Sequence, residues 1–229
     1  LGTLTLIARR SRHFAGVRYL KRGINERGDC ANEVETEQIV QDLSNGNAAH
    51  FPRVSAHVQT RGSIPLFWGQ DSQIMVPKPP VFVVRSDPYY RATVLHFSNL
   101  FSRYGSPTLI LNLVKSVEKI PRETILKEEY ESCITLLNET LPPEHRLIYI
   151  PWDFLRAQKM RMSDPVSLLA AIAEATLTKT GFYSSPTSVP YQAQLKNKDW
   201  VHGGLQRGVV RTNCIDSLDR TNAAQYCIG

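Results

Sequence analysis

A cysteine and an arginine in the last part of the sequence have the spacing of a phosphate-handling site. Cys214 is followed six residues later by Arg220, and Thr221 comes directly after the arginine. A cysteine thiolate is a strong nucleophile, and the planar fork of an arginine donates hydrogen bonds to two oxygens of a phosphate. The pair therefore predicts a phosphate-monoester site with Cys214 as the nucleophile. Among the four cysteines, Cys214 alone has an arginine at this spacing.

The residues around Cys214 predict a strand before it and a helix after it. Residues 208–210 form a short apolar segment, which is typical of a buried strand, and residues 221–226 are expected to form the first turns of a helix. A thiol in this position faces the unpaired backbone N–H groups and the positive end of the helix dipole. These groups favour both the thiolate of Cys214 and a bound phosphate. The alternative is that Cys214 is a small buried apolar residue, as most isolated cysteines are.

Length and composition are those of an ordinary globular protein. The chain has 229 residues, enough for a substantial core in one large domain or two small ones. Apolar residues make up 42% and charged residues 21%, and no apolar run approaches the ~20 residues that span a bilayer. The four cysteines have no regular spacing, which favours reduced thiols over a disulfide framework. No Cys-x2-Cys or His-x3-His spacing indicates a metal site.

Basic residues are concentrated near the start of the chain. The net charge is +6, and the basic cluster there is opposed mainly by Glu26. Such a run is often a solvated face, but it also fits an anionic membrane surface or an inositol phosphate headgroup. A nucleic-acid partner is disfavoured, because no basic motif interleaved with aromatic residues is present. The cluster comprises Arg9, Arg10, Arg12, Arg18, Lys21, Arg22 and Arg27.

The first part of the chain predicts antiparallel strands. Residues 4–7 read as a strand that leads into the basic cluster. Residues 17–20 and 34–40 are expected to pair as antiparallel strands around a turn at residues 25–29. A further strand is expected before residues 61–63, Arg-Gly-Ser. These three residues either place donors close to a phosphate or form a tight turn.

The rest of the chain alternates helices and strands, which predicts an α/β fold. Asp87 and Pro88 are expected to begin a helix that Gly105 ends. Residues 109–114 read as a buried parallel strand, and Lys115 follows at the end where ligands commonly bind. With the antiparallel first part, this predicts a mixed, partly parallel central sheet flanked by helices. The remaining expected elements are a helix over 121–140, a strand over 147–150, a helix capped by Asp164 and Pro165, and a polar connection over 184–198.

Residues 211–222 resemble the signature of the Sac-domain phosphoinositide phosphatases. They read Arg-Thr-Asn-Cys-Ile-Asp-Ser-Leu-Asp-Arg-Thr-Asn, with two aspartates inside a Cys-x5-Arg-Thr frame. Protein tyrosine phosphatases usually have a glycine-rich loop, so the acidic loop is specific. Ser217 departs from the pattern, because many members of the family have a second cysteine there. Further hallmarks of the family are found at residues 9–12, 15–19, 31–38 and 61–68.

The resemblance covers nearly the whole chain and implies more than the reaction type. It implies that residues 1–229 are a Sac catalytic region, without the subdomain that precedes it in the family and the helices that follow. Residues 103–107, 112–115 and 141–146 look most like the branch that acts on phosphatidylinositol 3,5-bisphosphate. That branch removes the 5-phosphate at the cytosolic face of endosomal and vacuolar membranes. It works there in a complex with the opposing lipid kinase and a scaffold protein.

Together, the spacing and the resemblance assign roles within the site. Cys214 attacks phosphorus to give a phosphocysteine, which water then hydrolyses. Loop amides and Arg220 stabilise charge on the phosphoryl oxygens, so this chemistry requires no metal or other cofactor. The general acid is left open among Asp216 and Asp219 in the loop and Asp153 at the end of a neighbouring strand. The residues expected to bind substrate are Asn213, Ile215, Ser217, Leu218, Thr221, Arg61 and Lys115.

The sequence leaves more than one class of function open. A lipid phosphatase is favoured, because Cys214, Arg220 and both loop aspartates are intact. The alternative is a phosphatase-like scaffold that binds phosphoinositides and assembles partners without turnover. A protein tyrosine phosphatase is a third hypothesis, which activity on phosphopeptides exceeding that on lipids would support.

Overall fold

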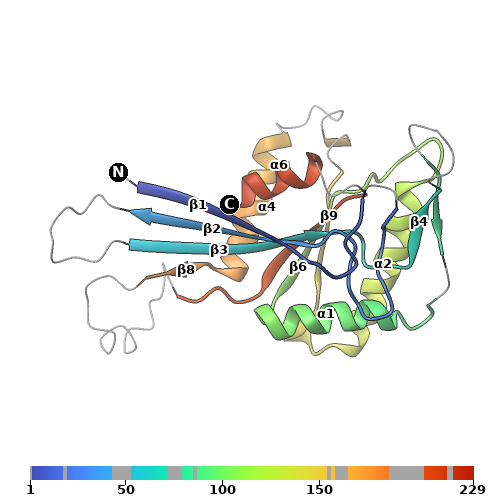
Figure 1. Ribbon diagram of the computed structural model, residues 1–229, viewed down its shortest axis with the longest axis horizontal. Helices are drawn as coiled ribbons and strands as arrows, with labels where there is room; N and C mark the ends of the chain where they lie inside the picture. Colours follow the sequence, from blue (N-terminus) through green and yellow to red (C-terminus); the bar gives the residue numbers. More distant parts are fainter. Residues whose placement is uncertain are drawn as a thin grey trace.

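The computed structural model describes most of the chain, and its residues form a mixed sheet with helices on both sides (Figure 1). The described residues contain a seven-stranded sheet and a separate two-stranded one. In the described part of the chain, no helix is both long enough and apolar enough to cross a membrane. The described ranges are 2–17, 20–42, 53–71, 79–84, 87–153, 156–157, 165–185, 204–215 and 219–229.

The large sheet combines an antiparallel half with a parallel half. Strands β1, β2 and β3 pair antiparallel, whereas β3, β9, β6 and β7 run parallel to one another. Strand β8 (Tyr183–Ser184) adds to β3. The prediction of a mixed, partly parallel sheet is therefore confirmed. In spatial order the strands are β1 (Gly2–Arg10), β2 (Val34–Asp42), β3 (Arg53–Gly62), β9 (Val209–Asn213), β6 (Thr108–Asn112) and β7 (Ile148–Pro151).

Helices cover both faces of the sheet. Helix α1 (Arg91–Tyr104) lies against one face and α6 (Asp219–Ile228) against the other, as Figure 1 shows. Helix α4 (Pro165–Thr180) contacts α6, and α2 (Glu123–Thr140) carries Tyr130, whose ring packs 5.6 Å from that of Tyr149 on β7. The short elements are β4 (Trp68–Gln70), β5 (Val81–Val83) and the 3-10 helix Pro143–His145.

The two central strands form the middle of the core. Every residue of β6 and β9 is buried, which fits strands that helices cover on both faces. Apolar side chains of the helices pack onto them, including Phe97 of α1, Leu126 of α2 and Ile228 of α6. Cys133 on α2 is fully buried in this core.

The predicted pairing of residues 17–20 with 34–40 is wrong. Strand β2 pairs instead with β1 along its full length, from Gly2 opposite Asp42 to Arg10 opposite Val34. The nine residues of β1 that pair with β2 form more backbone hydrogen bonds than the short segment 17–20 could form. The predicted turn at residues 25–29 is nevertheless present, closed by a β-bridge between Ile24 and Cys30.

The predicted start of the helix at Asp87 and Pro88 is also wrong, because α1 begins at Arg91. The backbone N–H of Tyr90 donates to the carbonyl of Asp87 at 2.9 Å, and this closes a turn rather than a helix. Tyr90 has the left-handed φ of 46°, and its hydroxyl donates to Glu129 of α2 at 2.8 Å. Gly105 ends the helix as predicted. The predicted cap Asp164 and most of the connection 184–198 lie outside the described residues.

His57 makes the stability of the fold depend on pH. Its side chain is buried on β3, and burial lowers the pKa of His57 from the usual 6.5 to about 4. As the pH falls from 6.5 to about 4, His57 binds a proton in the unfolded chain before it does so in the folded one. The folded state therefore loses stability over this pH range. From this group alone we expect the free energy of unfolding to be about 2 kcal/mol lower at about pH 5 than at about pH 7.5.

Urea denaturation at the two pH values measures this difference. His57→Phe should remove about 2 kcal/mol of the pH dependence, because phenylalanine does not titrate. The exposed His13 provides the control, since His13→Gln should leave the dependence as it is in the parent protein. An unchanged dependence in His57→Phe would show that other groups are responsible.

Candidate active site

Cys214 lies at the edge of the sheet where the four parallel strands end. Gly62, Asn213 and Asn112 align in register at the ends of β3, β9 and β6, and β7 ends beside them. Cys214 follows β9 directly and is buried, with 2% of its surface exposed. Because α6 begins at Asp219, the thiol lies between a strand end and a helix start, as the sequence predicts.

Arg220 is held in place by a buried carboxylate. Its Nη1 donates to Oε2 of Glu123 at 2.7 Å and to the carbonyl of Leu113 at 2.7 Å, and its Nη2 donates to Oε1 of Glu123 at 3.2 Å. The side chain of Glu123, the first residue of α2, is only 4% exposed. A two-pronged contact fixes the plane of the guanidinium. Glu123 therefore holds the Nη1–Nη2 edge of Arg220 in the first turn of α6.

Several predicted binding residues gather around the start of α6. Arg61 on β3 donates through Nη1 to Oδ1 of Asn222, and burial lowers the pKa of Arg61. Thr221 is fully buried, and its Oγ1 has no hydrogen-bond partner among the described residues. Ile215 is buried beside Cys214. These residues line the end of β9 and the first turn of the helix, which is where a phosphate would bind.

Two other predicted binding residues are engaged in structural contacts. Asn213 is fully buried, and its Nδ2 donates to the carbonyl of Ser63 at 3.2 Å, which ties β9 to the turn after β3. Lys115 lies on the connection from β6 to α2, where its Nζ is 3.8 Å from Oε1 of Glu118. Lys115 therefore lies near the end of β6, at the same edge of the sheet as Cys214.

The three candidates for the general acid differ in their surroundings. Asp219 is exposed at the first position of α6. Asp153 follows β7, and its Oδ2 accepts hydrogen bonds from the backbone N–H and the hydroxyl of Ser116 at 2.7 and 2.8 Å. Such bonds stabilise the carboxylate, so Asp153 is poorly suited to donate a proton. The predicted site residues that lie outside the described part of the chain are Asp216, Ser217 and Leu218.

Comparison with known proteins shows the family of the chain. The family model of the SacI homology domain matches residues 2–159, which is more than half of the chain. The chain belongs to the SacI homology family. The matched region contains β1 to β7 and supplies the strands on either side of β9.

Relatives of this SacI homology chain extend the similarity through Cys214. It is 48% identical over 236 residues to polyphosphoinositide phosphatase of Schizosaccharomyces pombe, with 99% of this chain and 26% of that protein covered. It is 42% identical over 265 residues to phosphoinositide phosphatase SAC4 of Arabidopsis thaliana, with 99% and 32% covered. It is 39% identical over 279 residues to phosphatidylinositol-3-phosphatase SAC1 of the same plant, with 99% and 30% covered. The chain thus spans about a quarter to a third of the length of these relatives.

Arg22 also lies at the candidate site, although in the sequence it is only one member of the basic cluster. It is buried, and its Nη1 donates to the carbonyl of Ile215 at 2.8 Å. Its Nε donates to Oε1 of Gln70 at 2.9 Å, and its guanidinium lies 5.7 Å from the ring centre of Trp68. A buried cation therefore lies against the residue that follows Cys214, where its charge attracts a phosphate.

The backbone next to Arg22 explains why its side chain points to Ile215. The N–H of Gly23 donates to Oγ of Ser63 at 2.8 Å, and the N–H of Ile24 donates to the carbonyl of Leu66 at 3.0 Å. Gly23 has a φ of 69°, and a Cβ there would lie 2.3 Å from the carbonyl oxygen of Leu66. Glycine is thus required for this close approach. In the sequence, the role of Arg22 is indicated only by its place before a glycine, in a stretch without acidic residues.

Arg211, the first residue of the signature, has a positioning role inside the SacI homology fold. It is fully buried, and its Nε donates to Nε2 of His96 on α1 at 2.8 Å. Burial and the charge of Arg211 hold the pKa of His96 well below its usual value, so the ring is neutral and accepts this bond. Nη2 of Arg211 donates to the carbonyl of Ser63 at 2.9 Å. Arg211 therefore links α1, β9 and the turn after β3.

Part of the basic cluster is neutralised within the sheet. Arg9 on β1 forms ion pairs with Glu35 at 3.1 Å and Glu37 at 2.5 Å on β2. Arg10 donates to Oδ1 of Asn32 at 2.7 Å and to the carbonyl of Gly16 at 2.9 Å. These contacts show that the two arginines help to hold β1 and its following connection in place.

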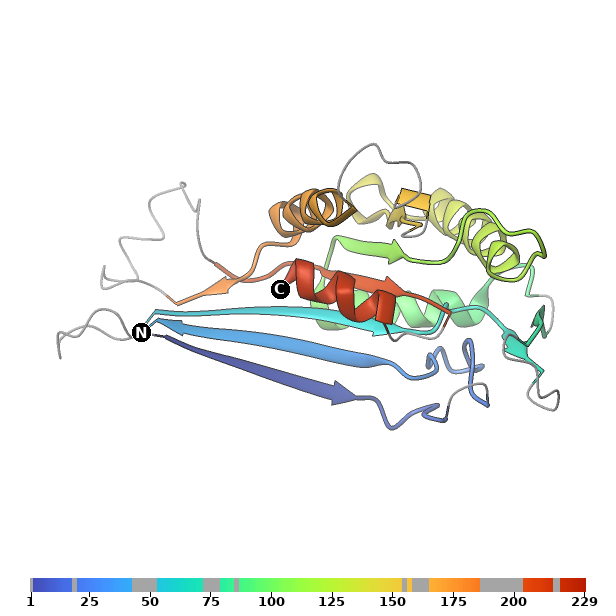
Figure 2. The same cartoon turned by 90° about the horizontal axis from the view of Figure 1, so that it is seen from above.

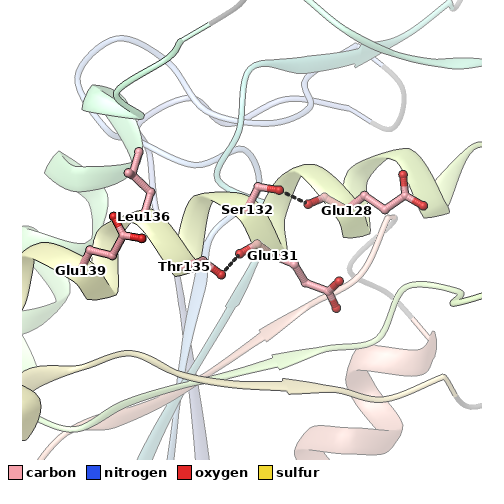
Figure 3. A pocket seen from close by; sticks show the side chains of 6 residues that line it. All are labelled: Glu128, Glu131, Ser132, Thr135, Leu136 and Glu139. Atoms are coloured by element: carbon pink, nitrogen blue, oxygen red, sulfur yellow. Dashed lines mark hydrogen bonds between the residues drawn. The ribbon is translucent and has the colours of Figure 1, made fainter.

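A hollow on the outer surface of α2 is lined by acidic side chains (Figure 3). All of its lining residues come from this one helix, and the hydroxyls of Ser132 and Thr135 donate to backbone carbonyls of the helix at 3.0 and 2.9 Å. Carboxylates repel phosphate, so this hollow is not the substrate site. Its lining residues are Glu128, Glu131, Ser132, Thr135, Leu136 and Glu139.

Proposed function

We propose that this protein is a phosphoinositide phosphatase that hydrolyses a phosphate monoester on the inositol ring through a phosphocysteine on Cys214. The observation that carries the proposal is the position of Cys214 between the end of β9 and the start of α6, with Arg220 anchored by Glu123. The relatives support the substrate class, because their names describe phosphatases of phosphoinositides.

The proposed reaction is an in-line attack on phosphorus. The thiolate of Cys214 forms the S–P bond while the bond from phosphorus to the inositol oxygen breaks. The start of α6 and the charges of Arg220 and Arg22 stabilise the phosphoryl oxygens. A proton then goes to the inositol oxygen from the general acid, for which Asp216 and Asp219 are the remaining candidates. Water finally hydrolyses the phosphocysteine and frees the thiolate.

The most specific form of the proposal names the lipid and its location. We assign the 5-phosphate of phosphatidylinositol 3,5-bisphosphate as the leaving phosphate, because the resemblance at residues 103–107, 112–115 and 141–146 favours that branch. The 48% identity to a protein named polyphosphoinositide phosphatase supports the coarser class of substrate. The protein would then act peripherally at the cytosolic face of endosomal and vacuolar membranes, together with a lipid kinase and a scaffold protein.

A panel of water-soluble, short-chain phosphoinositides tests this function on the full-length protein. Phosphate release should be fastest from phosphatidylinositol 3,5-bisphosphate, with phosphatidylinositol 3-phosphate as the product. Preference for another isomer would overturn the assigned substrate but not the reaction. Binding without phosphate release from any isomer would support the scaffold alternative, and faster release from phosphotyrosine peptides would support a protein phosphatase.

Arg22 should matter for turnover although it is remote from Cys214 in the sequence. Arg22→Met removes the cation beside Ile215, and we expect kcat/KM for the short-chain lipid to fall about 10- to 100-fold. Arg22→Lys keeps the charge and should restore part of the activity. The exposed Arg27 on the same connection offers a control, because Arg27→Met should leave kcat/KM unchanged. Normal turnover in Arg22→Met would limit the role of Arg22 to folding.

A further inference from the structure

Two connections at the active-site end of the molecule carry exposed aliphatic side chains. Val17 and Leu20 lie between β1 and β2, and each is 64% exposed. Val117 and Ile120 lie between β6 and α2, and are 70% and 76% exposed. Figures 1 and 2 both show these two connections at the end of the molecule where β9 finishes, and therefore on the side of Cys214. We call these four residues the apolar tips.

The backbone that carries Val117 and Ile120 is fixed. Oε2 of Glu118 accepts hydrogen bonds from three successive N–H groups at the start of α2, those of residues 122, 123 and 124, at 2.9, 2.6 and 3.2 Å. Its side chain is only 8% exposed, so it lies under the connection while its neighbours project outward. An aliphatic side chain that is already held in solvent can bury its surface on binding without a large loss of conformational freedom.

The charges next to the apolar tips are basic. Lys119 is exposed beside Ile120, and Lys115 is partly exposed on the same connection, whose one carboxylate, Glu118, is turned inward. Arg12 and Lys21 are exposed on the first connection, and residues 11–23 contain no acidic residue. Aliphatic side chains flanked by cations complement an anionic bilayer, where the apolar groups enter the acyl boundary and the cations meet lipid phosphates.

We propose that the apolar tips are a membrane-docking surface that inserts into an anionic bilayer. Insertion at this end of the molecule would bring the edge of the sheet with Cys214 to the level of the lipid headgroups. A headgroup could then reach the thiolate while its acyl chains remain in the bilayer. The proposal rests on the proposed function only in taking the substrate to be a membrane lipid.

Vesicle sedimentation of the full-length protein tests the docking surface. The vesicles contain phosphatidylcholine with roughly one fifth phosphatidylserine, which supplies the negative surface potential. We expect Val117→Gln/Ile120→Gln and Val17→Gln/Leu20→Gln each to weaken binding at least about tenfold, because polar side chains lose the gain from burying apolar area. Turnover of a water-soluble short-chain phosphoinositide should stay at the parent level, because the tips lie outside the site that holds phosphate.

A matched control comes from β1. Leu4 and Leu6 are 62% and 63% exposed, close to the values of Val17 and Leu20. They pair with Val40 and Gln38, in the part of β1 away from the active-site end, which lies at the Arg10 end of the strand. Leu4→Gln/Leu6→Gln should bind the vesicles as the parent protein does. Equal weakening by this variant would overturn the proposal, because general loss of apolar surface would then explain the effect.

A direct readout of insertion is the fluorescence of a tryptophan at the tip. Ile120→Trp should give a blue shift of emission with anionic vesicles relative to the parent protein, and the absence of a shift would overturn the proposal.

Normal vesicle binding by the tip variants, with loss of binding to a purified protein partner, would overturn the proposal in favour of a protein interface. Loss of short-chain turnover in the tip variants would place the tips in the catalytic site instead. Failure of the proposed function is distinguishable, because the parent would then release no phosphate while sedimentation still reports docking.

Discussion

Replacing Cys214 by serine is expected to reduce kcat/KM for phosphate release by more than about 10⁴-fold. A serine hydroxyl stays protonated near neutral pH and is a far weaker nucleophile than a thiolate. Cys214 is buried with 2% exposure, and serine is of similar size, so the fold should be retained. Phosphate release from short-chain phosphatidylinositol 3,5-bisphosphate measures the effect, and circular dichroism checks the fold.

Cys227 provides the matched control for this substitution. It is a free, partly buried cysteine on α6, and Cys227→Ser should keep turnover close to that of the parent protein. Residual activity of more than a few per cent in Cys214→Ser would rule out the thiolate mechanism. Loss of activity in both variants would point to damage to α6 rather than to a missing nucleophile.

Arg220→Lys is expected to lower kcat/KM about 10²- to 10³-fold, because a point charge cannot replace the planar fork that meets two phosphate oxygens. The buried partner adds a second test. Glu123→Ala leaves the guanidinium without its carboxylate and should destabilise the fold by about 3–5 kcal/mol. Glu123→Gln keeps the shape of the side chain and should lower kcat/KM about tenfold by loosening Arg220.

A double-mutant cycle separates the two roles of this pair. If Glu123 acts by orienting Arg220, then adding Glu123→Gln to Arg220→Lys should lower kcat/KM little further. Full additivity of the two effects would contradict that role and make Glu123 an independent contributor. Arg207, which is exposed before β9, offers the control, because Arg207→Lys should leave kcat/KM unchanged.

The order of elements around Cys214 could be predicted from local sequence. The apolar run before the cysteine became β9, and the residues after Arg220 became α6, because both signals depend on neighbours in the chain. The partner of β2 could not be predicted in the same way. Strand pairing depends on which segment offers the longest matching register, and residues 17–20 lost that competition to β1.

The support of the site was hidden for a related reason. Arg22 contacts Ile215 across 193 positions of sequence, and Glu123 contacts Arg220 across 97. Neither residue belongs to a motif with a spacing that could reveal the contact. In the sequence, Arg22 is one of several arginines near the start, and Glu123 is a residue within a helical pattern. Only the folded sheet brings their connections to the edge where Cys214 lies.

The position of β9 has a consequence for how the protein is made. It is the last strand along the described chain, yet it lies between β3 and β6 in the middle of the sheet. A ribosome delivers β3 and β6 long before β9, so the edges that these two strands will share with β9 stay open during synthesis. Open edges invite pairing with other chains. Because Cys214 follows β9 directly, the folding step that places β9 between β3 and β6 also forms the active site. A nascent chain is therefore most exposed to aggregation just before its active site forms.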